Sequence, residues 1–199
     1  MDTYNFLRAL PRPFGLANWV TLIRALVAIA LLTEATFLFA TGRTATRTWL
    51  RWLLVAAASA ALCLDGADGH LARRLGTASR FGARFDMETD AVMILALAAL
   101  VWGFGQAGAW VLASGLMRYM FAASGCLWPV LALPLPRSKR RQAVCVAQAI
   151  ALILAIAPPI TPLWGSAICL AGLVVLSYSF GLDLAWIAGQ ARAKGEAVW

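Results

Sequence analysis

Charged residues are scarce in this sequence. Only 13% of the 199 residues are Asp, Glu, Lys or Arg, while 62% are hydrophobic and the mean hydropathy is +0.77. Soluble globular domains carry ~25% charged residues, so this composition excludes a large soluble domain. Because about 20 apolar residues span a bilayer as a helix, we expect an all-α integral membrane protein that folds as one domain.

Histidine and cysteine are also scarce, and neither occurs in a metal-binding pattern. The one histidine, His70, has no second imidazole near it in the sequence, and the four cysteines lie apart in apolar surroundings without CxxC spacing. The cysteines are interpreted as small hydrophobic residues, which disfavours a disulfide framework or a zinc site. The first residues lack a basic stretch followed by an apolar core and a cleavage site, so no secretory signal is expected.

Six apolar runs, separated by turns rich in glycine and proline, predict about six transmembrane helices. The runs cover residues 17–40, 49–64, 85–104, 107–135, 143–157 and 163–188. The preceding residues mix aromatic and basic side chains and are interpreted as a short segment at the membrane interface. The predicted organisation is an interfacial segment 1–15, a single six-helix transmembrane domain 16–190 and a cytoplasmic tail 191–199.

Basic residues are distributed unevenly between the two ends of these helices. An even number of spans places both termini on one side, which then carries twelve Lys and Arg residues against three, Arg43, Arg47 and Arg51, on the other. Lys and Arg are enriched on the cytoplasmic side of membrane proteins. We therefore expect a multi-pass protein of the inner (cytoplasmic) membrane with both termini in the cytoplasm. The net charge of +8 has the same explanation, and no nucleic-acid partner is expected.

Acidic residues are few, and five of the nine lie between Asp65 and Asp90, at the cytoplasmic end of the second span and the start of the third. Asp65 and Asp68 are three residues apart and Asp86 and Asp90 are four apart, so each pair shares one helix face. A reversal between the helices can bring all four carboxylates together. Two such charges ~4 Å apart repel by about 4 kcal/mol at an effective dielectric near 20, so cations are expected between them. Oxygen ligands suit Mg²⁺ or Mn²⁺.

Small residues and one arginine complete the pattern, which reads Asp65-x2-Asp68-Gly69-x2-Ala72-Arg73-x8-Gly82-x3-Asp86-x3-Asp90. Gly69, Ala72 and Gly82 leave room for a phosphate-bearing group to approach the backbone, and Arg73 offers a planar fork of donors to a phosphate. These residues predict a site for a metal and a nucleotide diphosphate. The alternative is a solvated acidic loop paired with nearby arginines, which is disfavoured because the second carboxylate pair begins an apolar helix, where acids are costly.

This run resembles the signature of the CDP-alcohol phosphatidyltransferases, D-x2-D-G-x2-A-R-x8-G-x3-D-x3-D, at all eight specified positions. The run Asn18-x2-Thr21-x2-Arg24, which enters the first span, is similar to an N-x2-T-x2-R run found early in many members. The resemblance implies a six-helix, homodimeric enzyme of phospholipid synthesis. Such an enzyme transfers a phosphatidyl group from a CDP-linked lipid such as CDP-diacylglycerol to an alcohol, and it releases CMP.

The resemblance also implies a role for each residue of the signature. Asp65, Asp68 and Asp86 would hold Mg²⁺ or Mn²⁺, two ions in all, with Asp90 beside them as the base for the acceptor hydroxyl and as part of the metal site. Six residues would form the nucleotide site that holds the CDP group: Asp65, Asp68, Gly69, Ala72, Arg73 and Gly82.

The acceptor alcohol is expected near a second group of basic residues. In members that use phosphorylated acceptors, basic residues between the fourth and fifth spans contact the acceptor phosphate. The run Lys139-Arg140-Arg141 loosely resembles the G-K-x-K-T run of members that use glycerol phosphate, and departs from it at Ser138 and Gln142. Glycerol 3-phosphate is therefore the leading acceptor. Inositol phosphate, serine, choline and phosphatidylglycerol remain open, as does a CDP-linked small alcohol that donates to diacylglycerol.

Two ionisable residues within spans are further candidates. Arg118 lies inside the fourth apolar run, where an arginine is a functional candidate by default, and it is expected to face the polar cavity and to bind the acceptor. Asp183, in the last span, is expected to snorkel or to find a polar partner on another helix.

Two other classes of function compete with the transferase. A cation transporter could use the same carboxylates without chemistry, but the outer halves of the spans are nearly free of ionisable groups. A membrane scaffold protein without catalytic activity would not need Asp90. The expected partners are therefore a CDP-linked lipid, an alcohol acceptor, membrane lipids and a second copy of the chain.

Overall fold

The computed structural model describes residues 16–42, 48–75, 80–117, 119–120 and 138–193, and within these ranges the chain forms helices and turns without a strand. For residues 16–19, 66–75, 80–84 and 191–193 it describes the helical backbone alone. The elements are α2 (Leu16–Thr41), α3 (Thr48–Leu75), α4 (Arg80–Gly103), the 3₁₀ turn η1 (Ala109–Leu112), α6 (Lys139–Ile156) and α7 (Pro162–Ala193). The expected all-α fold is confirmed.

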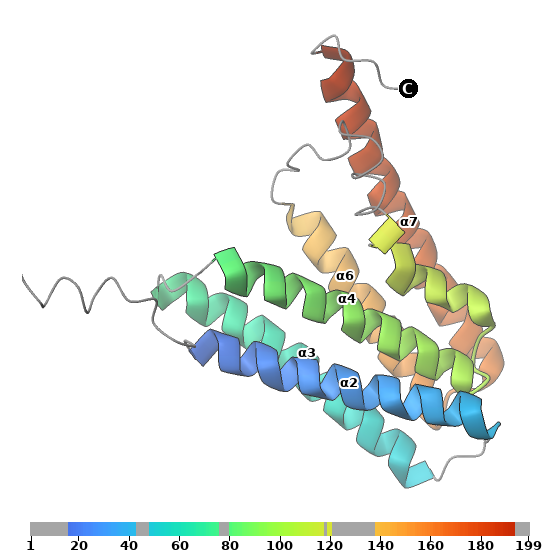
Figure 1. Ribbon diagram of the computed structural model, residues 1–199. Helices are drawn as coiled ribbons and strands as arrows, with labels where there is room; N and C mark the ends of the chain where they lie inside the picture. Colours follow the sequence, from blue (N-terminus) through green and yellow to red (C-terminus); the bar gives the residue numbers. More distant parts are fainter. Residues whose placement is uncertain (1–15, 43–47, 76–79, 118, 121–137, 194–199) are drawn as a thin grey trace, which may run out of the picture.

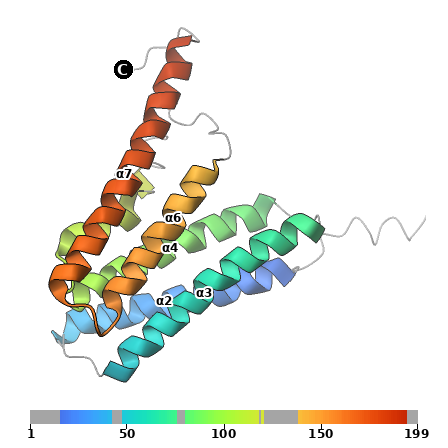
Figure 2. The ribbon, with the colours of Figure 1, turned by 180° about the vertical axis from the view of Figure 1, so that it is seen from behind.

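The helices form two groups that diverge from one end of the molecule (Figure 1, Figure 2). Helices α2, α3 and α4 lie side by side as one group, and α6 lies beside α7. The starts of α2 and α4 meet the end of α3 at one end of the group, and we call this the signature end because the acidic residues lie there. The far end holds the end of α2, the start of α3 and the link between α6 and α7.

Turn residues explain where the helices stop at the far end. Gly42 and Gly105 have φ angles of +63° and +69°, a backbone conformation that glycine adopts at no steric cost. Pro158 and Pro159 follow the end of α6, and proline cannot continue a helix because it lacks a backbone N–H. Pro162 is the first residue of α7, a position where proline is favoured.

Helix α4 is the central element of the core. Residues 96–101 are buried without a break, and α4 packs against α2, α6 and η1. Leu31 from α2 and the pair Leu152 and Ile156 from α6 belong to the same apolar cluster. Alanines are frequent on α4, and small side chains allow neighbouring helices to approach closely.

Within the described ranges, three helical segments are long and apolar enough to cross a membrane: Val20–Thr41, Thr48–Asp65 and Pro162–Gln190. They expose large apolar side chains, such as Trp49 on α3 and Leu163 and Tyr178 on α7. Contiguous exposed apolar surface marks a membrane or protein contact. The expectation of an all-α membrane protein is thereby confirmed.

The helices differ from the predicted spans mainly at the signature end. Helix α3 continues past the predicted end at residue 64 to Leu75, and α4 already begins at Arg80. The acidic signature therefore lies on two helices, because its glycines weaken a helix by only about 1 kcal/mol each and no proline interrupts it.

Several predicted segments lie outside the described residues. These are the interfacial segment 1–15, most of the fourth predicted span and the last residues of the tail, so the number of spans stays a prediction. Helix α7 continues to Ala193, which is within the predicted tail.

Candidate functional site

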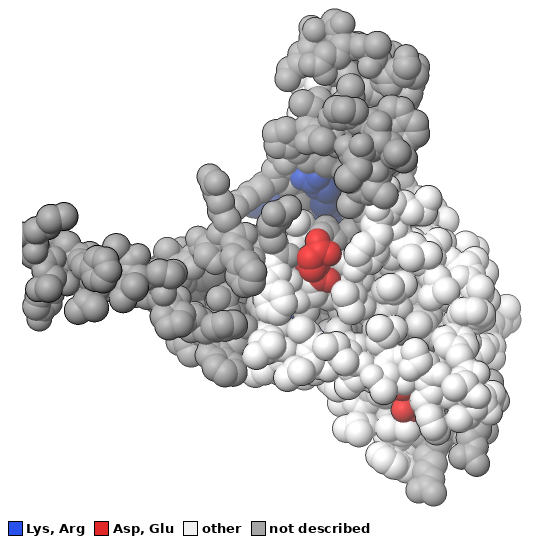
Figure 3. All heavy atoms as spheres, viewed as in Figure 1, with Lys and Arg blue, Asp and Glu red and all other residues white. Residues whose placement is uncertain are grey.

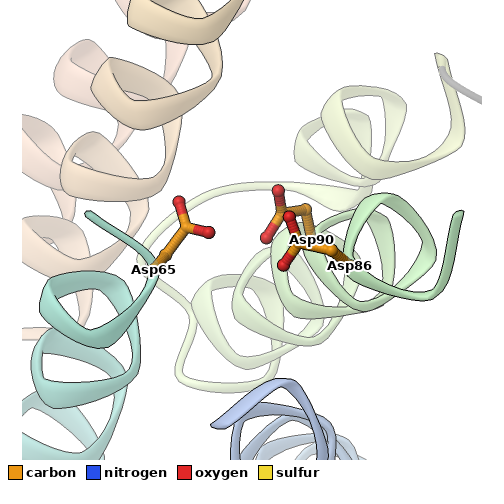
Figure 4. Close-up of side chains that lie close together, drawn as sticks. All are labelled: Asp65, Asp86 and Asp90. Carbon is orange, nitrogen blue, oxygen red and sulfur yellow. The ribbon is translucent and has the colours of Figure 1, made fainter. Parts of the chain in front are cut away.

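Three carboxylates from two helices converge at the signature end (Figure 4). Asp65 lies on α3 and points toward Asp86 and Asp90, which lie one turn apart on α4. Each residue offers one carboxylate oxygen, and these three oxygens lie within 4.8 Å of one another. All three residues are half-buried. Clustered carboxylate oxygens of this kind are the ligands that Mg²⁺ and Mn²⁺ prefer, so the residues fit a divalent metal.

The guanidinium group of Arg24, from α2, lies among these carboxylates. Its Nη1 atom is 2.8 Å from Asp65 Oδ1 and 2.5 Å from Asp86 Oδ1. Its Nη2 atom donates a hydrogen bond to Asp90 Oδ1. The Arg24 side chain is only 3% exposed. One guanidinium thus joins three helices at the site, and its single positive charge leaves the described cluster negative overall.

The other signature residues lie on the same two helices. Asp68, Gly69, Ala72 and Arg73 follow Asp65 within the continuous helix α3, and Gly82 lies in the first turn of α4. Their side chains lie outside the described residues. Their predicted roles in metal and CDP binding therefore stay predictions, as do the roles predicted for the described carboxylates.

Helix α6 begins with three basic residues, which we call the basic group: Lys139, Arg140 and Arg141. Figure 3 shows basic atoms beside an acidic patch that lies over α4, on one face of the molecule. The Arg140 Nη2 atom is 2.5 Å from Asp183 Oδ1, and the Arg141 Nε atom is 3.8 Å from Asp183 Oδ2. Lys139 is exposed. The ion pairs of the basic group thus link the start of α6 to α7.

Asp183 itself lies on α7, and its side chain is 11% exposed. A buried carboxylate is costly unless it is paired, and Arg140 on α6 supplies the pair. Asp183 therefore has the polar partner on another helix that the sequence suggested. Arg118, the other acceptor candidate within a span, lies outside the described residues.

Sequence reasoning assigned no role to Arg24. The available signal was an arginine within an apolar helix, which marks a functional candidate by default. That argument was applied to Arg118 alone, although both arginines meet it. Arg24 lies among three carboxylates, so the same argument makes it a candidate as well.

Comparison with known proteins agrees with this geometry. A family model described as CDP-alcohol phosphatidyltransferase matches residues 14–179, which include the carboxylate cluster, Arg24 and the basic group. The comparisons found no matching curated protein and no matching solved structure. Because the matched segment covers most of the chain and contains the complete acidic signature, this protein belongs to the CDP-alcohol phosphatidyltransferase family.

Proposed function

We propose that this protein transfers a phosphatidyl group from CDP-diacylglycerol to an alcohol, releasing CMP, in phospholipid synthesis. Its family acts on CDP-alcohol substrates and an alcohol acceptor, and members generally use divalent metals. The observation that carries the proposal is the convergence of Asp65, Asp86 and Asp90 within 4.8 Å of one another. A transporter would also need a polar route across the bundle, whereas residues 96–101 in the second half of α4 are apolar and buried without a break.

In this proposal, Asp65, Asp68 and Asp86 hold two divalent ions, Mg²⁺ or Mn²⁺, with Asp90 beside them. When bound, the ions neutralise the diphosphate and the charge that develops on the leaving CMP. Asp65 and Asp68 also face the nucleotide, together with Gly69, Ala72, Arg73 and Gly82. The small residues let the diphosphate approach the helix backbone, and Arg73 donates to a phosphate oxygen.

Asp90 acts as the general base. The acceptor hydroxyl gives its proton to the Asp90 carboxylate, and the hydroxyl oxygen attacks the phosphorus that bears the diacylglycerol. A new oxygen–phosphorus bond forms as the bond from this phosphorus to the CMP oxygen breaks, and CMP leaves with that electron pair. The hydrogen bond from Arg24 orients the Asp90 carboxylate. A positioned base of this kind contributes about 10²–10⁴-fold to the rate.

Glycerol 3-phosphate is the proposed acceptor. Arg140 and Arg141 lie in the first turn of α6, and basic atoms lie near acidic atoms on one face of the molecule (Figure 3). Guanidinium groups bind phosphate through paired hydrogen bonds. In this proposal, Arg140 and Arg141 bind the phosphate of the acceptor while its hydroxyl reaches Asp90. Lys139, exposed at the start of α6, and Arg118 are proposed to add positive charge.

The signature end is proposed to face the cytoplasm in a homodimer at the inner membrane. The excess of Lys and Arg that the sequence predicts on the side of the acidic signature supports the orientation. A cytoplasmic site is accessible both to a water-soluble acceptor and to the nucleotide head of a lipid in the inner leaflet.

The test is CMP release from CDP-diacylglycerol by the purified protein in detergent. Mg²⁺ or Mn²⁺ is supplied, and glycerol 3-phosphate, inositol phosphate, serine, choline and phosphatidylglycerol are compared as acceptors. We expect release with glycerol 3-phosphate, loss of release in Asp90→Asn and little change in Glu34→Gln, which removes an acid further along α2. Release with a different acceptor would contradict the proposed acceptor. No release with any acceptor from folded, metal-binding protein would contradict the proposed reaction.

A further inference from the structure

Arg24 contacts the residues that would bind a metal, and it does so from the protein interior. It is 3% exposed and reaches one Oδ1 atom on each of Asp65, Asp86 and Asp90. Its Nε atom is buried and has no hydrogen-bond partner among the described residues. The contacts of Arg24 at this site are therefore concentrated on the three carboxylates.

A divalent cation and Arg24 would compete for the same negative charge. Mg²⁺ binds oxygen at 2.0–2.1 Å, and the Arg24 nitrogens already lie within hydrogen-bond distance of an oxygen on each carboxylate. An ion on these carboxylates would lie only a few ångströms from the guanidinium, where like charges repel strongly at the low effective dielectric of a half-buried site. The cation must therefore share the carboxylate oxygens with the Arg24 guanidinium or displace the guanidinium from them.

We propose that Arg24 is a built-in counter-cation of the metal site: it weakens divalent-metal binding and stabilises the packing of α2, α3 and α4 without metal. The idea rests on the metal site of the proposed function and assigns Arg24 a positioning role through the carboxylates. Because Arg24 neutralises part of the carboxylate charge, the carboxylates alone do not balance the charge of the bound metal ions. The diphosphate of a CDP-linked lipid supplies the remaining negative charge, so the site is suited to hold metal more tightly once substrate is bound.

The first test measures Mn²⁺ binding to the purified protein in detergent, without any lipid or acceptor, from the free Mn²⁺ signal in electron paramagnetic resonance. Removing a positive charge a few ångströms from a cation site is expected to lower the Kd of Arg24→Gln roughly tenfold or more. Arg51→Gln is the matched control, because Arg51 is another arginine within a span whose described contacts are a backbone carbonyl and an aromatic ring. Its Mn²⁺ affinity should equal that of the wild type. Adding Asp86→Asn to Arg24→Gln should abolish the gain.

The second test is thermal unfolding in EDTA and in Mn²⁺. Arg24→Gln should unfold at lower temperature than the wild type in EDTA, because three carboxylates are left without their counter-cation, and Mn²⁺ should restore most of the difference. Arg24→Lys retains the charge but cannot bridge three carboxylates with a planar fork. It should show a Mn²⁺ affinity close to that of the wild type.

Several outcomes would overturn the proposal. These are equal or weaker Mn²⁺ binding by Arg24→Gln, no binding by either protein, or an Arg24→Gln protein that stays unfolded in Mn²⁺, since the ion should replace the guanidinium. None of these measurements uses substrate. A tighter Mn²⁺ site in Arg24→Gln, together with a wild type that releases no CMP, would therefore reject the proposed reaction and keep this inference.

Discussion

Two arginines within apolar helices lie at opposite ends of the bundle and serve different purposes. Arg24, at the signature end, lies among three carboxylates. Arg51, at the far end, donates from Nε to the Ile156 carbonyl oxygen at 3.0 Å, and its guanidinium lies 5.0 Å from the centre of the Phe104 ring. Among the described residues, Arg51 forms no ion pair. The position of an arginine in a membrane helix therefore does not reveal its function, whereas the groups around it do.

The contacts of Arg51 are explained by the end of a helix. Ile156 is the last residue of α6, and the final carbonyl groups of a helix lack intrahelical partners and carry partial negative charge. A guanidinium satisfies one carbonyl oxygen and also packs on an aromatic face. These contacts explain one of the three basic residues, Arg43, Arg47 and Arg51, that were predicted to lie on the side poor in Lys and Arg. The contacts of Arg51 at the far end are thus structural, and the proposed chemistry lies at the signature end.

The largest effect is expected for Asp90→Asn at the signature end. Loss of the base should lower kcat for CMP release by about 10²–10⁴-fold, while Mn²⁺ binding by the remaining carboxylates persists. Initial rates at saturating CDP-diacylglycerol measure the first quantity, and Mn²⁺ titration measures the second. Turnover within tenfold of the wild type would remove Asp90 from the role of base.

A smaller effect is expected for Asp183→Asn on α7, which changes the ion pair between α6 and α7. The change leaves Arg140 without its charged partner, and loss of a charge-assisted hydrogen bond costs about 1–3 kcal/mol. We expect a lower unfolding temperature in detergent, together with a higher KM for glycerol 3-phosphate because the basic group loses its support. An unchanged unfolding temperature would show that the 2.5 Å pair contributes little.

Arg141→Ala tests whether the basic group recognises an anionic acceptor. Loss of one guanidinium–phosphate interaction should raise the KM for glycerol 3-phosphate roughly tenfold and leave the KM for CDP-diacylglycerol unchanged. The matched control is Lys139→Ala, which removes an exposed charge from the same turn and should have less effect. An equal rise of both KM values in Arg141→Ala would argue against recognition of the acceptor phosphate.

The smallest effect is expected for Arg51→Gln at the far end. Loss of one hydrogen bond to a carbonyl group and of one cation–π contact should lower the free energy of unfolding by about 1–2 kcal/mol. The KM values and kcat should be those of the wild type. A fall in kcat comparable to that of Asp90→Asn would break the division between a chemical end and a structural end.

Much of the candidate site could be predicted from the order of residues. The spacing of Asp65, Asp86 and Asp90 predicted that carboxylates from two helices would meet, and the structure brings these three within 4.8 Å. The extent of α3 was underestimated because the apolar run ends near residue 64, whereas the helix continues through polar residues to Leu75. Hydropathy shows which part of a helix lies in an apolar environment. It does not show where the helix ends, because the backbone hydrogen bonds of a helix can continue through polar residues.

The sequence alone determined the class of the protein: apolar runs require a bilayer, and the acidic spacing identifies the family. Only the tertiary structure decided which charged groups pair. Arg24 and Asp86 are 62 residues apart, Arg140 and Asp183 are 43 apart, and Arg51 and Ile156 are 105 apart. Hydropathy and spacing are local properties that can be read along a chain. The partner of a charge depends on which helices pack together, and that follows from the shapes and burial of side chains over the whole bundle.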